Sequence, residues 1–363
     1  MRFLLAIFAT LAAATASVAS SVDIRLYPPR PLIEVTRLGQ ALNFDLEVRN
    51  MTKAVLELTA IRALVRDASG AVVQRLEVND NGIAPGIETI PVRTWQPGES
   101  HTICNPFDTL GPDVPVSGIE YELLFKTPDG RAVTQKVVAE PRRYHAGTDL
   151  IMPLAGRVLV WDGHDFLSHH RRWDFSNPAS RALGITTNAS RYAFDFVVAD
   201  RDGAFFTGDG QKREDYPGYG SPVLAPAAGT VVRMFGAAPN AAASMTAAGY
   251  RQDALRAVFG NYIVIDHGNG EYSQLGHLKQ GSVKVKVGDK VTAGQVIAQV
   301  GASGTSLFPH LHYQLVDKPG LDGEGLPAAF TGVTRAGAMR QQRITRTWID
   351  SGDIVESPPP AAK

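Results

Sequence analysis

The sequence predicts an all-β protein with two domains, an immunoglobulin-like β-sandwich followed by a second strand-rich domain with a short helical insert. The chain has 363 residues, which is enough for about two domains of roughly 150 residues each. Short runs of alternating apolar and polar residues, separated by turn sequences, recur along most of the chain and are typical of β-strands. An alanine-rich stretch at residues 237–258 departs from this pattern and favours the helical insert.

Residues 1–19 have the features of a secretory signal peptide. Arg2 precedes an apolar run at residues 3–14, which is shorter than the ~20 residues that a membrane-spanning helix needs. Ser17 and Ala19 flank Val18 in the pattern of small residues that precedes a cleavage site, so we expect cleavage after Ala19. These features predict an exported protein, periplasmic or extracellular, with no stable insertion in a membrane.

Residues 22–140 carry the pattern of the first domain. Alternating or apolar runs occupy residues 42–49, 54–58, 60–65, 72–78, 121–126 and 132–138. The last two runs flank the turn Thr127-Pro128-Asp129-Gly130, which indicates a hairpin. Short strands at this spacing predict an immunoglobulin-like β-sandwich. No chemically active side chains converge in these residues, so we expect a spacer or a binding module.

A linker is expected at residues 141–145, and the second domain at residues 146–346. Short apolar runs predict strands at residues 229–234, 262–266, 283–285 and 296–300. Residues 253–259 favour a helix within the insert. The chain ends in a proline-rich segment that cannot pack, so we expect residues 347–363 to form a disordered tail.

The composition excludes some classes of partner. Lys and Arg together number 36 and Asp and Glu together number 36, so the formal net charge is zero. Nothing in this balance favours binding to nucleic acid or to an acidic membrane surface. Cys104 is the one cysteine in the sequence, so the chain has no internal disulfide, and we expect this side chain to be a small buried apolar group.

The sequence His310-Leu311-His312 is the first indication of a chemical site. In a strand, residues two apart point to the same face, so the imidazoles of His310 and His312 are expected side by side. Two imidazoles on one face are costly to bury without a partner. A divalent metal ion is the partner that usually accounts for such a pair.

An ordered set of motifs gives the second domain a family likeness. The motifs occupy residues 221–231, 260–270, 276–278, 287–297, 301–306 and 310–313. In this order, over roughly residues 150–320, they resemble the LytM/lysostaphin-type zinc metallopeptidases, which are murein endopeptidases. The resemblance implies an antiparallel β-sheet fold, Zn²⁺ as the cofactor and peptidoglycan peptides as the substrate.

The resemblance also implies roles for individual residues. Asp195 and His312 match zinc ligands of the family. His277 and His310 match the histidines that orient or deprotonate the attacking water and stabilise the oxyanion that develops on the substrate. The protein is therefore expected to be an exported zinc metalloendopeptidase that hydrolyses peptide bonds of peptidoglycan in cell-wall remodelling.

The first motif of the family, His-x-x-x-Asp, is altered here because Arg191 occupies the histidine position. Arginine stays protonated and offers only donors, so it cannot bind zinc. A hydrolytic zinc site needs three protein ligands, and we expect His170, or His169 beside it, to complete the set with Asp195. The alternative is that the metal site is lost. The domain would then be a catalytically inactive module that binds murein or activates a partner hydrolase.

Overall fold

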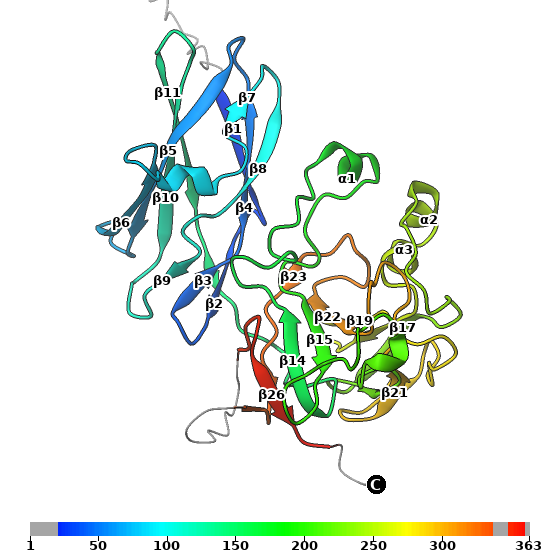
Figure 1. Ribbon diagram of the computed structural model, residues 1–363. Coiled ribbons are helices and arrows are strands. Elements are labelled where there is room, and N and C mark those ends of the chain that lie inside the picture. Colours follow the sequence, from blue (N-terminus) through cyan, green and yellow to red (C-terminus); the bar gives the residue numbers. More distant parts are fainter. Residues whose placement is uncertain (1–20, 337–347, 360–363) are drawn as a thin grey trace, which may run out of the picture.

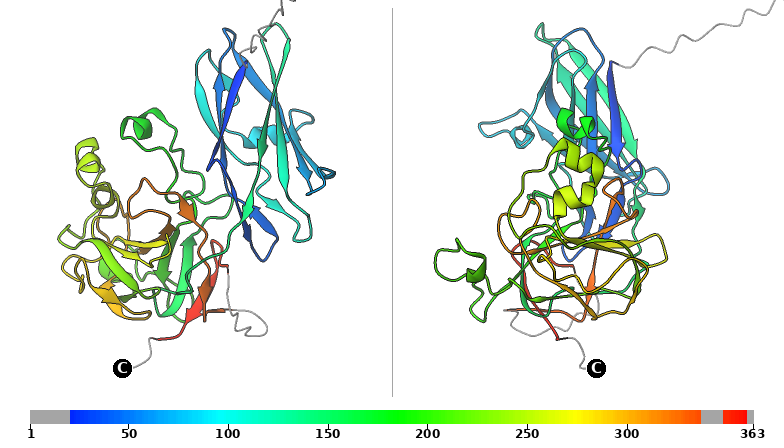
Figure 2. Two further views of the ribbon diagram at one scale, coloured as in Figure 1. Left: turned by 180° about the vertical axis from the view of Figure 1, so that it is seen from behind. Right: turned by 90° about the vertical axis from the view of Figure 1, so that its right-hand side faces the viewer.

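The computed structural model describes residues 21–336 and 348–359, so the predicted signal peptide at residues 1–19 lies outside the described residues. Two bodies lie side by side in Figures 1 and 2, and both consist almost entirely of strands. The α-helices of the described residues are short: α1 (Pro178–Ala182), α2 (Ala247–Gln252) and α3 (Ala254–Phe259). The all-β prediction is therefore confirmed. In the described part of the chain, no helix is long and apolar enough to span a membrane.

The N-terminal body is a sandwich of antiparallel strands. One sheet contains β1 (Val22–Tyr27), β4 (Asp45–Asn50) and β8 (Ser100–Cys104). The other contains β11 (Ala132–Ala139), β10 (Gly118–Lys126), β5 (Leu56–Arg66) and β6 (Val72–Asn79), with β7 (Thr94–Trp95) paired to β5. Alternate residues of β10 are buried, as expected for a strand with one face on the core. Whether this sandwich belongs to the immunoglobulin class stays a prediction.

A third sheet connects the sandwich to the second domain. It contains β12 (Arg142–Arg143), β2 (Leu32–Val35), β3 (Gln40–Leu42) and β9 (Thr109–Leu110). The predicted linker thus contains a strand, because β12 pairs in parallel with β2. Leu32 packs into the core of the second domain, whereas its neighbour Ile33 packs into the core of the sandwich. The two domains therefore meet in a packed junction.

The second domain is built on a ten-stranded sheet in which all recorded pairs are antiparallel, as the resemblance implied. Its strands, in spatial order, are β20 (Lys290–Val291), β17 (Gly229–Phe235), β18 (Tyr262–Asp266), β19 (Tyr272–Gly276), β22 (Leu311–Val316), β15 (Phe194–Val198), β14 (Gly156–Asp162), β26 (Ile354–Ser357) and β25 (Thr334–Arg335), with β23 (Gly325–Leu326) beside β22.

Smaller elements complete the fold. Two further strand pairs join β16 (Pro222–Leu224) to β21 (Val296–Gln299) and β13 (Leu150–Ile151) to β24 (Phe330–Thr331). Short 3₁₀ turns occupy Gly86–Thr89 and Arg213–Asp215.

An aromatic cluster beneath the sheet determines which side chains face the opposite side. Phe194 and Phe196 of β15 are fully buried, stack on each other with ring centroids 5.2 Å apart and contact Phe330. Tyr313 of β22 joins the same cluster. Because side chains alternate across a strand, Asp195 points away from this core, to the side that carries the candidate site.

Three expectations from the sequence need correction. The predicted disordered tail at residues 347–363 is wrong over residues 348–359, because β26 pairs with both β14 and β25 and Val355 is buried. The second domain therefore extends beyond residue 346. Residues 283–285 form no strand. The helical insert is two short helices, which follow one another at Asp253.

Candidate metal centre

Strand pairing brings the candidate residues to one place on the sheet. Asp195 of β15 lies directly opposite His312 of β22. On the other side of β22, Gly276 at the end of β19 lies opposite His312, so His277 follows at the strand end. His310 precedes His312 by two residues and shares its face. Neighbouring strands thus supply one carboxylate and three imidazoles.

Asp195 is the centre of this group and is buried, with 6% of its surface exposed. Its Oδ1 atom lies 3.0 Å from His312 Nδ1, 3.4 Å from His310 Nε2 and 3.5 Å from His170 Nε2. Burial acts to raise the pKa of Asp195, but the neighbouring His310 and His170 outweigh it and hold that pKa well below its usual value. Asp195 is therefore ionised.

Hydrogen bonds behind His312 determine which ring nitrogen faces Asp195. His312 Nε2 lies 2.9 Å from Gln314 Oε1, and the Gln314 amide donates to Gln274 Oε1 at 2.9 Å. The carbonyl end of Gln314 therefore accepts the hydrogen of Nε2. Nδ1 is left without a hydrogen and directs its lone pair at Asp195. A partner of this kind, behind a ligating histidine, is common in metal sites.

His170 reaches the same carboxylate from the segment between β14 and β15. Its Nδ1 atom lies 3.3 Å from Gly163 O, which accepts the Nδ1 hydrogen, and 3.0 Å from the Asp162 carboxylate. Its Nε2 atom therefore also directs a lone pair at Asp195. The ring of His169 is 69% exposed, and its Nδ1 lies 2.7 Å from Asp162. The structure thus places His170, and not His169, beside Asp195.

The donor atoms of His170, Asp195 and His312 lie within 4.8 Å of one another. Two imidazole lone pairs and a carboxylate oxygen face one another in a buried space, an arrangement that repels unless a cation lies between them. Two nitrogens and one oxygen form a donor set that suits Zn²⁺ among other divalent ions. The residues present therefore fit a metal ion.

His277 and His310 stand beside this donor set, with ring centroids 4.8 Å apart. Their Nδ1 atoms lie 2.8 Å from Ser303 O and 2.9 Å from Phe308 O, which leaves each Nε2 directed toward the site. Burial, with His310 and His312 nearby, lowers the pKa of His277 well below its usual value, so this ring is neutral. For His310, burial acts to lower the pKa, but the Asp195 carboxylate raises it above the usual value.

The backbone of His277 is also unusual. Among the described residues it is the one non-glycine residue in the left-handed region, with φ of 60°. That conformation is costly for a residue with a Cβ atom and tends to be kept where it positions a functional group. It turns the chain at the end of β19, where the imidazole meets the Ser303 carbonyl.

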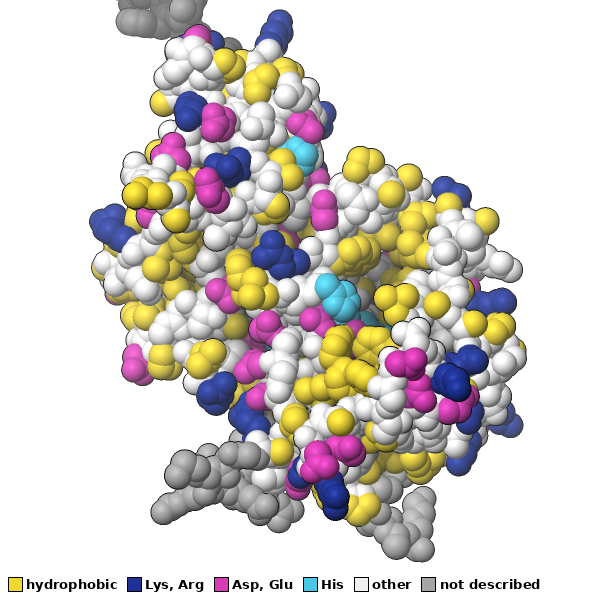
Figure 3. Space-filling model, in the orientation of Figure 1, with side chains coloured by type: hydrophobic (Ala, Val, Ile, Leu, Met, Phe, Trp, Pro, Cys, Tyr) yellow, Lys and Arg dark blue, Asp and Glu magenta, His cyan; other side chains and the backbone are white. Residues whose placement is uncertain are grey.

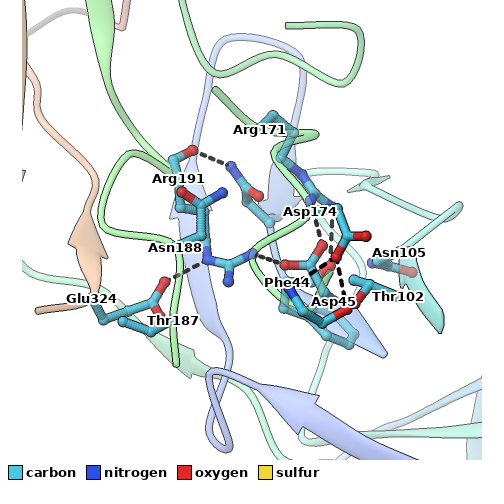
Figure 4. A network of polar contacts seen from close by, with 12 residues as sticks. Phe44, Asp45, Thr102, Asn105, Arg171, Asp174, Thr187, Asn188, Arg191 and Glu324 are labelled. Carbon is cyan, nitrogen blue, oxygen red and sulfur yellow. Dashed lines mark hydrogen bonds and ion pairs between the residues drawn. The ribbon is translucent and has the colours of Figure 1, made fainter. Parts of the chain in front are cut away.

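Arg191, at the position where the resemblance calls for a histidine, does not enter the site. Its side chain is fully buried and contacts Asp45 of the sandwich through Nη1, while Nε donates to Glu324 Oε1 at 2.5 Å. Figure 4 shows the guanidinium between these two carboxylates. Burial acts to lower the pKa of Arg191, yet both carboxylates raise it, so the side chain is charged.

The site opens into a cleft of about 600 Å³. Its apolar lining includes Trp161, Trp173, Ile185, Leu307 and Phe308. In Figure 3, a histidine is visible at the surface beside a hydrophobic patch in the hollow between the two bodies.

Sequence reasoning missed two residues that orient the donors. Gln314 could have been found, because it lies two residues after His312 on the same strand face. Asp162 could not, because a register shift in the pairing of β14 with β15 places it opposite Asp195. Two other histidines of the second domain have partners of their own. His164 is buried, with Nε2 3.1 Å from Glu34 Oε2, and His267 is partly buried against Ala228 O and Ser273 Oγ.

Comparisons with known proteins identify a family for part of the second domain. The model of peptidase family M23 matches residues 214–322, which include His277, His310 and His312. The peptidoglycan DD-endopeptidase ShyA of Vibrio cholerae is 46% identical over 57 residues, which make up 16% of this chain and 13% of ShyA. The match thus spans a small part of the length of that relative.

Solved structures of peptidases are also similar to this chain in sequence. The catalytic domain of the prophage-encoded M23 protein EnpA from Enterococcus faecalis is 22% identical, with 37% of this chain and 73% of that chain covered and a TM-score of 0.25. The catalytic domain of lysostaphin from Staphylococcus simulans is 25% identical, with 34% of this chain and 65% of that chain covered and a TM-score of 0.21. The resemblance inferred from the motifs is confirmed, and residues 214–322 of this chain form a domain of peptidase family M23.

Proposed function

We propose that this protein is an exported zinc metalloendopeptidase that hydrolyses peptide bonds of peptidoglycan during remodelling of the cell wall. The M23 domain and the identity with a peptidoglycan DD-endopeptidase support a hydrolase that acts on peptidoglycan peptides. The observation that carries the proposal is the convergence of His170, Asp195 and His312 within 4.8 Å, beside His277 and His310.

His170 Nε2, an oxygen of Asp195 and His312 Nδ1 would hold the zinc ion. Three protein ligands leave a position for water, as a hydrolytic zinc site requires. When bound, zinc supplies a Lewis acid that polarises the scissile carbonyl and lowers the pKa of a bound water.

His277 and His310 complete the chemistry from the cleft side. The Ser303 carbonyl accepts the Nδ1 hydrogen of His277, so Nε2 is free to accept a proton from the attacking water. The Phe308 carbonyl orients His310 in the same way, and its Nε2 atom faces the position of the reacting carbonyl beside Asp195. With a proton on Nε2, His310 donates to the oxyanion that develops there.

The lining of the cleft supports a peptide as the substrate. Apart from the histidines, Asp195 and Tyr250, the described residues that line the cleft have no ionisable side chain. Such a surface suits a neutral peptide backbone with small or apolar side chains, and it offers no lysine or arginine to a phosphate group.

Digestion of purified sacculi by the zinc-loaded protein tests the proposal. We expect soluble muropeptides whose masses identify one class of cleaved peptide bond, and we expect EDTA to abolish their release. Intact sacculi after incubation with protein shown to contain zinc would contradict the proposed activity. Detection of the mature protein in the periplasmic or extracellular fraction, with its new N-terminus after Ala19, tests the proposed export.

The altered first motif favours a second candidate. With Arg191 in place of a histidine, the domain would be a catalytically inactive module that binds murein or activates a partner hydrolase. This candidate predicts a protein that pellets with sacculi and releases nothing from them, even with zinc supplied. The two candidates therefore give opposite results in the digestion experiment.

A further inference from the structure

Two buried arginines of the second domain bind the same carboxylate of the sandwich. Arg171 Nη1 donates to Asp45 Oδ1 at 2.9 Å, and Arg191 Nη1 contacts Asp45 Oδ2. Both arginine side chains are at most 1% exposed and the Asp45 side chain is 2% exposed. Figure 4 shows Asp45 between the two guanidinium groups. We call these three residues the Asp45 clamp.

The Asp45 clamp holds both ends of the segment that lies between two of the metal donors, His170 and Asp195. Arg171 directly follows His170, and Arg191 precedes Asp195 by four residues. Most of this segment has no sheet partner, because β15 begins at residue 194 and the helix α1 within the segment is a single short turn. The position of His170 therefore depends on contacts outside the sheet.

Neighbouring atoms of the sandwich strengthen this attachment. Arg171 Nη2 donates to Phe44 O at 3.0 Å, and the Asn43 amide donates to Arg191 O at 3.0 Å. Side chains and backbone atoms of both domains therefore take part in holding this segment. By contrast, the metal donor His312 lies on β22, which the sheet itself positions.

A clamp of this kind adds little to the free energy of unfolding, but it strongly favours one arrangement of the chain. Burying charged groups costs solvation energy that their attraction only partly returns, so a buried ion pair often contributes little to the free energy of unfolding. The pair does require one geometry, because an unpaired buried charge is strongly unfavourable. Asp45 thus selects one position for the segment between Arg171 and Arg191.

We propose that Asp45 is a positioning residue for the metal centre, so that the N-terminal sandwich completes the zinc site in the adjacent domain. Arg191 occupies the histidine position of the His-x-x-x-Asp motif and binds Asp45 instead of a metal ion. The third metal donor is His170, which lies on a segment that the sandwich contacts through Asp45. This inference rests on the proposed function, since it concerns the affinity of the same centre for zinc.

The test compares the zinc affinity of full-length variants by competition with a chromophoric chelator. Asp45→Asn keeps the size of the side chain and removes its charge. We expect its zinc dissociation constant to rise about 10- to 100-fold, the range typical for residues that orient metal ligands. Glu271→Gln is the matched control, because Glu271 is a buried carboxylate that accepts hydrogen bonds from Tyr144 in the linker and from Gly147 just after it. The control should keep the zinc affinity within about twofold.

A milder variant covers the case in which Asp45→Asn does not fold. Arg171→Lys retains the positive charge but cannot bridge Asp45 and Phe44 O in the same way. We expect it to fold and to bind zinc several-fold more weakly than the unsubstituted protein. Unchanged zinc affinity in a folded Asp45→Asn or Arg171→Lys variant would overturn the inference. If the unsubstituted protein itself binds no zinc, the proposed function fails instead, so the two failures are distinguishable.

Discussion

Replacement of Arg191 by methionine probes the buried charges at the domain junction. Methionine is also unbranched, but it lacks the guanidinium charge that lies between the carboxylates of Asp45 and Glu324. Asp45 retains Arg171, but the side chain of Glu324, which is 13% exposed, loses its ion pair. Breaking a buried pair from one side costs about 3–5 kcal/mol of unfolding free energy. At roughly 2–4 °C per kcal/mol for a domain of this size, Tm should fall by ~6–20 °C.

The loss should depend on pH in a defined direction. Burial raises the pKa of Glu324 even though Arg191 lowers it, so removing Arg191 raises that pKa further. A carboxyl with a raised pKa in the folded state contributes stability below its unfolded value of about 4.3, and that stability is lost as the pH rises through the folded value. The Tm difference between Arg191→Met and the unsubstituted protein should therefore be larger near pH ~8 than near pH ~5.

Differential scanning calorimetry at the two pH values measures both effects. Addition of Glu324→Gln to Arg191→Met should recover much of the lost stability, because no buried carboxylate is then left unpaired. Arg62→Met is the control, since Arg62 pairs with Glu77 on the surface at 42% exposure, and it should cost less than about 1 kcal/mol. Equal Tm losses at both pH values, without recovery in the double variant, would show that the unpaired Glu324 carboxylate is not the cause of the lost stability.

Four further substitutions test the site itself. His170→Ala should remove zinc binding while His169→Ala leaves most of it, because only His170 faces Asp195, and element analysis of dialysed protein measures the difference; equal zinc contents would contradict this. His310→Ala should abolish sacculus cleavage with zinc retained, and unchanged hydrolysis would show that its assigned role is wrong. Gln314→Leu should weaken zinc binding about 10- to 100-fold, because Nε2 of His312 loses its acceptor; an unchanged affinity in chelator competition would exclude Gln314 from that role.

Local sequence periodicity predicted the part of the site that the sheet builds. Alternation along a strand was enough to place His310 and His312 on one face, and the family motifs identified Asp195 and His277. These residues lie on paired strands or directly beside them, where register determines which side chains meet. Their roles as ligands and catalytic groups stay predictions until the metal is measured.

The choice between His169 and His170 could not come from the sequence. Their segment has no strand periodicity, and the contacts that fix it join Asp45 to Arg171 and Arg191 across 126 and 146 residues of chain. No local pattern in the sequence indicates such a pairing. The same reasoning explains the error at the C-terminus, where residues 354–357 are too short to predict as a strand but gain two partners in the folded sheet.

Zinc stoichiometry is the most direct test of a metal centre formed by His170, Asp195 and His312. The purified full-length protein should retain one zinc ion per chain after dialysis against buffer without metal, and His312→Ala should retain almost none. A zinc content near zero in the unsubstituted protein, after incubation with excess zinc and removal of the unbound ion, would contradict the account.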